Sequence, residues 1–191
     1  MKQEGISYWK RLPAESKGTD EFHAVIEIPR GEKVKYEYSK MFDVLFLDRV
    51  LYSSVHYPEN YGFIPQTMAK DDDPIDILLI CQEPLVPLTV AQTKPIGGID
   101  MEDEKGVDHK IIGVASQDPQ YSEYEDIKDL PDHKMREIRQ FFSEYKKLEE
   151  KEVEVRGYFG PDKALGTIDE SMERFNQTYP EIEPITEDAK L

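Results

Sequence analysis

The sequence predicts a small α+β domain in which short β-strands come first and two α-helices follow. Three observations lead to this fold class. β-type runs dominate residues 22–80, two amphipathic helical patterns occupy the last third, and 191 residues suit one domain. Many short strands followed by helices are typical of a small β-barrel with helices packed outside it. We therefore expect a single domain over residues 1–191.

The expected strands are short runs bounded by Gly, Pro and Asp. The first run stops at Pro29, and the second alternates charged and apolar residues with the period of two that a strand requires. The remaining runs are apolar or mixed. The full set of expected strands is 23–28, 33–38, 44–52, 75–81, 91–99, 110–115 and 153–157.

Two helices are expected, over about 131–150 and 161–175, because apolar residues recur there at steps of three and four. Pro131 suits the first turn of the first helix. The apolar stripes consist of Met135, Ile138, Phe141, Phe142, Tyr145 and Leu148 in the first helix, and Leu165, Ile168, Met172 and Phe175 in the second.

The two ends of the chain lack such patterns. Residues 1–21 are polar and form an expected lead-in to the domain. Residues 177–191 are acidic and contain Pro180 and Pro184, so we expect an extended or disordered tail.

Composition excludes several classes of protein. Forty acidic residues against 24 Lys and Arg give a net charge of -16, which disfavours nucleic acid and anionic lipid as partners. The single cysteine, Cys81, excludes a disulfide framework and a four-cysteine zinc site, and is expected to be a core thiol. Residues 1–20 have no apolar signal region, and the longest apolar run is far below the ~20 residues of a membrane span. We expect a cytoplasmic protein with no membrane partner.

The sharpest motif is the acidic run 71–76, Asp-Asp-Asp-Pro-Ile-Asp, directly before an apolar strand. Carboxylates this close disfavour joint ionisation, and a hard divalent cation with oxygen ligands would neutralise them. A solvated acidic turn is the alternative, since charge runs are usually solvated. An EF-hand loop is not expected, because it needs a Gly at its sixth position and a Glu at its twelfth.

A second acidic cluster covers residues 100–110. Gly106 marks a turn, so Asp103 and Asp108 could face each other across a hairpin. A solvated loop is again the alternative. If both clusters meet at one end of a barrel, they could together hold several metal ions.

Basic and hydroxyl side chains lie on neighbouring segments. Lys35 and Glu37 share one strand face, and Glu27 stands between two isoleucines; for all three, a solvent-facing role and a site role both remain open. A phosphate site uses cations and tyrosine hydroxyls, and the sequence offers them at Arg49, in the aromatic loop 57–63 and at Tyr145-Lys146. The alternative for Tyr145-Lys146 is a core tyrosine beside a solvated lysine.

Other chemistries lack their motifs. The four histidines, His23, His56, His109 and His133, have no zinc-ligand spacing. The sequence contains no P-loop, no G-x-G-x-x-G and no G-x-S-x-G elbow.

The acidic run, with the apolar residue after it, resembles the D-x-D-P-x-D signature of the soluble family I inorganic pyrophosphatases. The resemblance extends from about Val25 to Glu150. Residues 51–54 and 80–84 are similar to the plant-type branch, whereas the manganese-dependent second family is not resembled. The matching segments are 25–29, 34–37, 50–54, 57–63, 103–110 and 141–146.

This resemblance implies a five-stranded OB-like barrel with two flanking helices. It also implies hydrolysis of pyrophosphate to two phosphates, with several Mg²⁺ ions and in-line attack by a metal-activated water. The implied metal ligands are Asp71, Asp76 and Asp108, with Asp103 joining Asp108 for the ions that arrive with substrate and Glu27 and Glu37 in support. Asp73 is the implied general base, and the implied phosphate-binding set is Lys35, Arg49, Tyr61, Lys110, Tyr145 and Lys146, with Tyr57 in support.

Two other functions compete with this one. A non-enzymatic domain that binds divalent ions would have no use for Lys35, Arg49 and the other phosphate-binding candidates. An OB-fold nucleic-acid-binding module is opposed by the net charge and by the lack of a basic, aromatic-studded strand face. The resemblance further implies a homo-oligomer, since hexameric and dimeric branches of the family exist.

Overall fold

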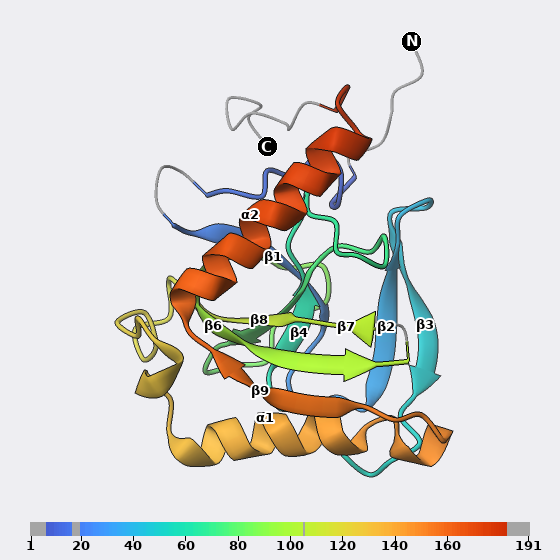
Figure 1. The fold of residues 1–191 in the computed structure, drawn as a ribbon, viewed down its shortest axis with the longest axis vertical. Coiled ribbons are helices and arrows are strands. Elements are labelled where there is room, and N and C mark those ends of the chain that lie inside the picture. The colour runs from blue at the N-terminus through green and yellow to red at the C-terminus, as the bar shows by residue number, and fades with distance from the viewer. Residues whose placement is uncertain (1–6, 17–19, 105, 183–191) are drawn as a thin grey trace.

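The computed structural model describes residues 7–16, 20–104 and 106–182 and has the expected α+β architecture (Figure 1). Two α-helices are present, α1 (Asp132–Glu144) and α2 (Pro161–Thr178), with 3-10 turns at Ile127–Asp129 and Lys147–Glu149. The strands are β1 (Phe22–Ile28), β2 (Val34–Ser39), β3 (Val44–Val50), β4 (Asn60–Phe63), β5 (Asp76–Ile80), β6 (Val90–Asp103), β7 (Gly106–Val107), β8 (Lys110–Ala115) and β9 (Glu154–Phe159).

The main sheet contains a closed circuit of strand pairings. The order is β1–β4–β5–β8–β6, and β6 pairs back onto β1. Within this strand circuit β5 and β8 are parallel and the other pairs are antiparallel. The 14-residue β6 is long enough to pair with β7 and β9 as well, so the sheet has seven strands, of which five form the closed circuit.

A β-bulge in β1 prepares the site. Ile26 pairs with Gly62 and Ile28 pairs with Tyr61, so Glu27 is an extra residue between two paired positions. The backbones approach closely here, because a Cβ on Gly62 would lie 1.9 Å from the Val25 carbonyl oxygen. Only glycine fits at that position.

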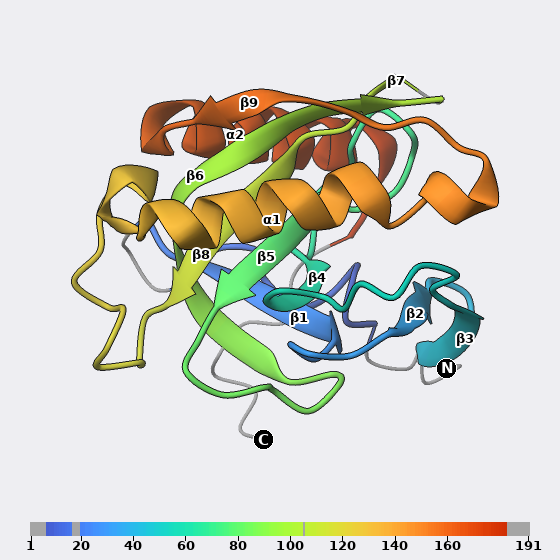
Figure 2. The same ribbon diagram turned by 90° about the horizontal axis from the view of Figure 1, so that it is seen from below.

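The helices cover opposite sides of β5 and β8, and alternate residues of these strands meet different helices. Leu78 and Val114 share a buried cluster with Phe142 of α1, whereas Ile77 shares another with Ile168 of α2. Figure 2 shows α1 crossing β5 and β8. Each such side chain contributes about 1.5–3 kcal/mol when fully buried, so both strands are anchored on two sides.

Strands β2 and β3 form a separate two-stranded sheet, the hairpin (Val34–Val50), which stands beside the strand circuit (Figure 1). Its turn and outer surface are apolar and exposed, with Met41 81% and Leu47 63% exposed. The hairpin therefore lacks the two-sided cover that β5 and β8 have.

Several expectations need correction. Strand β4 lies within the segment expected to be an aromatic loop. The first helix ends at Glu144 rather than near residue 150, and Tyr145 is its C-cap. Cys81 is half-buried at the end of β5 rather than fully in the core.

The ends of the chain pack more than expected. Helix α2 continues to Thr178, two residues into the expected tail, and Tyr179 and Ile182 pack against a cluster around Trp9. Trp9, in the expected lead-in, is 2% exposed. The remaining tail, 183–191, lies outside the described residues. No helix within the described ranges is long and apolar enough to cross a membrane.

Candidate active site

A cavity of about 650 Å³ lies where the strand circuit, the hairpin and α2 meet. All fourteen residues singled out from the sequence line it, although they come from seven strands, three loops and the end of α1. They are Glu27, Lys35, Glu37, Arg49, Tyr57, Tyr61, Asp71, Asp73, Asp76, Asp103, Asp108, Lys110, Tyr145 and Lys146.

The acidic run forms a tight loop that divides its carboxylates. Asp71 and Asp73 line the cavity, whereas Asp72 does not and has a left-handed backbone with φ +66°. The Ala69 N–H donates to the Asp73 carbonyl oxygen at 2.7 Å, and the Asp73 N–H donates to Asp71 Oδ1 at 3.3 Å. These bonds close the loop, so alternate carboxylates point into the cavity.

A buried lysine stands at the centre of the carboxylates. Lys110, the first residue of β8, is 3% exposed, and its Nζ lies 2.5 Å from Asp76 Oδ2 and 2.8 Å from Asp108 Oδ1. Burial opposes its charge, but the two carboxylates outweigh that effect and raise the pKa of Lys110 well above its usual range. Burial raises the pKa of Asp108, while Lys110 opposes that rise.

The second acidic cluster is held by the β6–β7 turn. Asp103 pairs with Gly106 rather than with Asp108, whose N–H instead donates to the Met101 carbonyl oxygen at 2.8 Å. The expectation that the two aspartates face each other across the hairpin is therefore wrong. Asp103 instead meets Lys146, with Oδ2 and Nζ 2.8 Å apart and both side chains largely buried.

The hairpin supplies a charged cluster. Lys35 and Arg49 pair across β2 and β3, and each is ion-paired with Asp48. Lys35 also bonds Glu37, and Arg49 Nε lies 2.8 Å from Glu149 Oε1. Burial opposes the charge on Lys35, but its bonds to the two carboxylates prevail and raise its pKa. Both cations therefore stay charged.

Glu27 is the most perturbed carboxylate of the cavity. The bulge aims it into a buried position, where Oε1 accepts a 2.7 Å hydrogen bond from the Tyr38 N–H. Burial raises the pKa of Glu27 to about 8, against the lowering effect of that hydrogen bond. A nearby cation would lower this pKa and favour the charged form.

The three tyrosines form a buried group. The Tyr57 ring lies 5.3 Å from the Tyr61 ring and 4.7 Å from Phe141, and Tyr145 stacks on Phe141 at 5.3 Å. Burial raises the pKa of all three hydroxyls, so they remain protonated donors at neutral pH.

One wall of the cavity escaped the sequence reasoning. Lys163, Thr167, Glu170 and Arg174 of α2 line it, and they recur at steps of three and four beside the apolar stripe. That polar periodicity could have indicated a second functional face. Lys40, Lys70 and Lys151 line the cavity as well. The described lining residues therefore include nine acidic and nine basic side chains, whereas acidic residues outnumber basic ones in the whole chain.

The donor chemistry suits a hard divalent cation. The carboxylates offer oxygen ligands only, and the Lys110 ammonium already occupies the position of a cation shared by Asp76 and Asp108. Over the described ranges no three Asp, Glu, His or Cys side chains converge as a ready-made metal site, because Lys110 and Lys146 hold Asp76, Asp108 and Asp103. These carboxylates therefore fit such an ion once the two lysines leave them.

Comparison with known proteins identifies the family. The family model described as inorganic pyrophosphatase matches residues 24–176. A soluble inorganic pyrophosphatase of Solanum tuberosum is 45% identical over 87% of this chain and 79% of its own length. An inorganic pyrophosphatase of Picrophilus torridus is 42% identical over 92% and 99%. The crystal structure of the inorganic pyrophosphatase from Thermus thermophilus superposes with a TM-score of 0.85 at 40% identity, covering 89% of this chain and 99% of that one. The chain therefore belongs to the inorganic pyrophosphatase family.

Proposed function

We propose that this protein hydrolyses inorganic pyrophosphate to two orthophosphates in the cavity, with Mg²⁺ as its metal. One observation carries the proposal: fourteen residues spread over 120 positions of sequence line one cavity, with carboxylates and cations side by side. Pyrophosphate is a small, strongly charged anion, so it needs both the cations and metal ions held by the carboxylates.

The carboxylates would hold the metal ions. Asp71, Asp76 and Asp108 are suited to the tightly held ions, and Asp103 joins Asp108 for the ions that arrive with the substrate. Glu27 and Glu37 support them. When bound, Mg²⁺ would neutralise phosphate charge and lower the pKa of a water molecule, so that the water can lose a proton and attack phosphorus.

The protein's own groups perform the remaining steps. Asp73 accepts the proton of the attacking water. Lys35 and Arg49 hold phosphate oxygens from the hairpin, and Lys110 and Lys146 do so when they leave their carboxylate partners. Tyr57, Tyr61 and Tyr145 contribute hydroxyl donors that strengthen as charge develops on the leaving phosphate.

Phosphate release from pyrophosphate tests this function. With Mg²⁺ the protein should release two phosphates per pyrophosphate, and excess chelator should abolish the activity. Ca²⁺ should bind and yet support little turnover, because its looser coordination misaligns the reacting groups. Full activity in chelator would contradict the proposal.

Three finer features belong to the same proposal. The closed strand circuit supports an OB-like barrel. A cytoplasmic location fits the single free Cys81. Self-association is supported by the exposed apolar side chains of Met41, Phe42, Val44, Phe46, Leu47, Val50 and Tyr52. Sedimentation of the wild type should show an oligomer that Phe46→Glu weakens; an unchanged oligomer would mean that another surface associates.

A further inference from the structure

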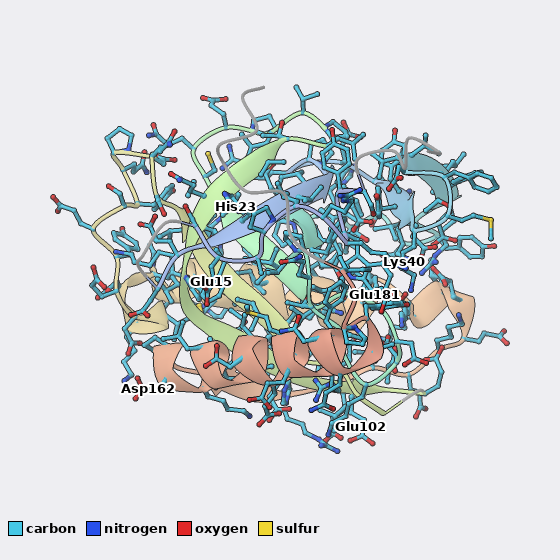
Figure 3. All side chains as sticks on the ribbon, turned by 90° about the horizontal axis from the view of Figure 1, so that it is seen from above. Glu15, His23, Lys40, Glu102, Asp162 and Glu181 are labelled. Atoms are coloured by element: carbon cyan, nitrogen blue, oxygen red, sulfur yellow. The ribbon has the colours of Figure 1, made fainter. Side chains whose placement is uncertain are left out.

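Lys40 connects the acidic loop to a part of the protein that lies outside the matched family region. It occupies the turn between β2 and β3. Its Nζ lies 2.6 Å from Asp73 Oδ1 and 2.9 Å from the Asp72 carbonyl oxygen. The same ammonium lies 4.8 Å from the centre of the Trp9 ring. Figure 3 shows Lys40 beside the C-terminal end of α2, consistent with the shallow pocket that it shares with Trp9 and Tyr179.

The Trp9 ring is a fixed support. It is buried, its Nε1–H donates to the Thr67 carbonyl oxygen at 2.8 Å, and it makes edge contacts with Phe175 at 5.6 Å and Tyr179 at 5.7 Å. A cation over an aromatic ring at this separation is attracted by the ring's quadrupole. Trp9 precedes residue 24, where the family match begins. The support is therefore contributed by the segment before the part matched by the family model.

The acidic loop needs such a restraint. Asp72 has φ +66°, a conformation that an Asp residue adopts at a cost in free energy. Lys40 binds the carbonyl oxygen of that strained residue and the carboxylate of the next one, so it fixes the peptide group between them. Its side chain is 35% exposed and that of Asp73 is 55% exposed. An ion pair so exposed adds little to global stability, so its effect is local.

We propose that Lys40 is a positioning residue for Asp73, and that Trp9 holds Lys40 in place. By binding Oδ1, Lys40 sets the orientation of the carboxylate and assigns the proton of the attacking water to Oδ2. This inference rests on the proposed function, in which Asp73 is the general base. It adds a residue that acts through Asp73 and a segment of the chain that precedes the family-model match.

Kinetics of three variants test the proposal. Lys40→Met should lower kcat about tenfold while KM changes less than about twofold, because only the orientation of the base is lost. Lys40→Arg keeps a cation and donors, and should restore most of the loss. Lys10→Met is the matched control: the Lys10 ammonium lies 4.0 Å from the Tyr179 ring and 5.6 Å from the Trp9 ring, and it should leave kcat unchanged. A loss confined to KM, or one reproduced by Lys10→Met, would overturn the proposal.

Hydrogen exchange supplies a readout that needs neither metal nor substrate. The Ala69 amide is bonded to the Asp73 carbonyl oxygen, so it should exchange faster in Lys40→Met but not in Lys10→Met. Unchanged exchange of Ala69 in Lys40→Met would refute the positioning role. If Asp73→Asn proves fully active, the assignment of the base fails, while the exchange result still decides the role of Lys40.

A double variant and a Trp9 variant complete the test. In the Asp73→Asn background, Lys40→Met should not lower kcat further, since the group that it positions is already lost. A further tenfold loss would show that Lys40 acts elsewhere. Trp9→Leu, checked for folding by thermal melting, should lower kcat about threefold through loss of the cation–π contact. A folded Trp9→Leu protein with wild-type kcat would remove Trp9 from the proposal.

Discussion

The strand circuit and the hairpin line the same cavity, but the apolar side chains of the circuit are buried and many of those in the hairpin are exposed. In the circuit, Leu78 and Ile112 are 0% exposed and are covered by a helix. In the hairpin, Phe46 is 51% and Val50 is 50% exposed. The circuit and its loops carry most of the carboxylates proposed as metal ligands, whereas the hairpin carries Lys35 and Arg49. In the proposed function, the metal-binding half of the site is thus built on the buried part, and two phosphate-binding cations are built on the exposed part.

The proposed chemistry places different demands on the buried circuit and on the exposed hairpin. Carboxylates that share metal ions must be held close despite their repulsion, and a packed sheet supplies that rigidity. Cations that bind a substrate and then release its products gain from a support that can adjust. Glu27 joins the two regions, because its carboxylate lies in β1 and accepts its hydrogen bond from Tyr38 of β2.

The largest expected effect concerns the acidic loop between the two regions. Asp73→Asn keeps the shape but cannot accept a proton, so kcat should fall by roughly 10²–10⁴ with Mg²⁺ binding retained. Asp76→Asn, at the start of β5, should weaken Mg²⁺ binding instead, and excess Mg²⁺ should rescue it partly. Mg²⁺ titrations of kcat distinguish the two. Equal rescue of both variants would make Asp73 a ligand rather than the base.

Truncation of one apolar side chain in each region should give unequal losses of stability. Leu78→Ala empties a buried position and should lower the free energy of unfolding by about 2–5 kcal/mol. Phe46→Ala removes an exposed side chain and should change it by less than about 0.5 kcal/mol in the monomer. Urea unfolding at low protein concentration measures both. Similar losses would mean that the hairpin is covered in solution.

Variants of the proposed substrate-binding residues compare the hairpin and the strand circuit by their kinetic constants. Lys35→Ala removes a hairpin cation whose proposed contact with phosphate would strengthen in the transition state, so KM should rise and kcat should fall. Tyr61→Phe in β4 removes one hydroxyl and should cost on the order of 1–2 kcal/mol of transition-state stabilisation. Steady-state kinetics at saturating Mg²⁺ give both values. A Lys35→Ala enzyme with wild-type constants would exclude Lys35 from the phosphate site.

The smallest expected effect is a pH dependence of the free energy of unfolding, caused by a buried carboxyl group next to the strand circuit. Glu59 is 1% exposed and ion-paired with Lys134 of α1. Burial raises its pKa, and Lys134 opposes the rise. As pH rises above the ordinary pKa of a glutamate, the unfolded chain loses this proton before the folded chain does, so stability falls until the folded carboxyl also ionises. As pH rises through this range, the free energy of unfolding should fall less steeply in Glu59→Gln than in the wild type. An equal slope in both proteins would exclude Glu59 as a source of the pH dependence.

Physical reasoning on the sequence located the two acidic clusters, and the resemblance assigned their individual roles. No sequence pattern indicates that Asp72 lies outside the cavity, because that depends on a single left-handed backbone angle. Strand β4 was also missed, since Tyr61-Gly62-Phe63 has neither strict alternation nor a β-branched run. Its place in the sheet depends on the close approach to β1 that Gly62 permits.

The residues that sequence reasoning overlooked are charged side chains whose role depends on tertiary neighbours. Lys40 lies in a turn, where a lysine is normally solvated, and its contacts to Asp73 and Trp9 span 33 and 31 positions. Met41 and Phe42, beside it, are exposed although apolar. Local patterns predict neither arrangement, because both follow from how the hairpin lies against the rest of the chain.

The many pairings of β6 determine how the protein reaches its native state. This strand contacts β1, which precedes it by more than sixty residues, and β9, which follows it by about fifty. Such non-local pairings slow folding, because the entropy of closing long loops is lost before the contacts form. On the ribosome, β1 must wait for β6 to be synthesised before the circuit can close. During that interval the apolar edges of β1 and β5 are open to wrong partners, so chain elongation and folding compete at this strand.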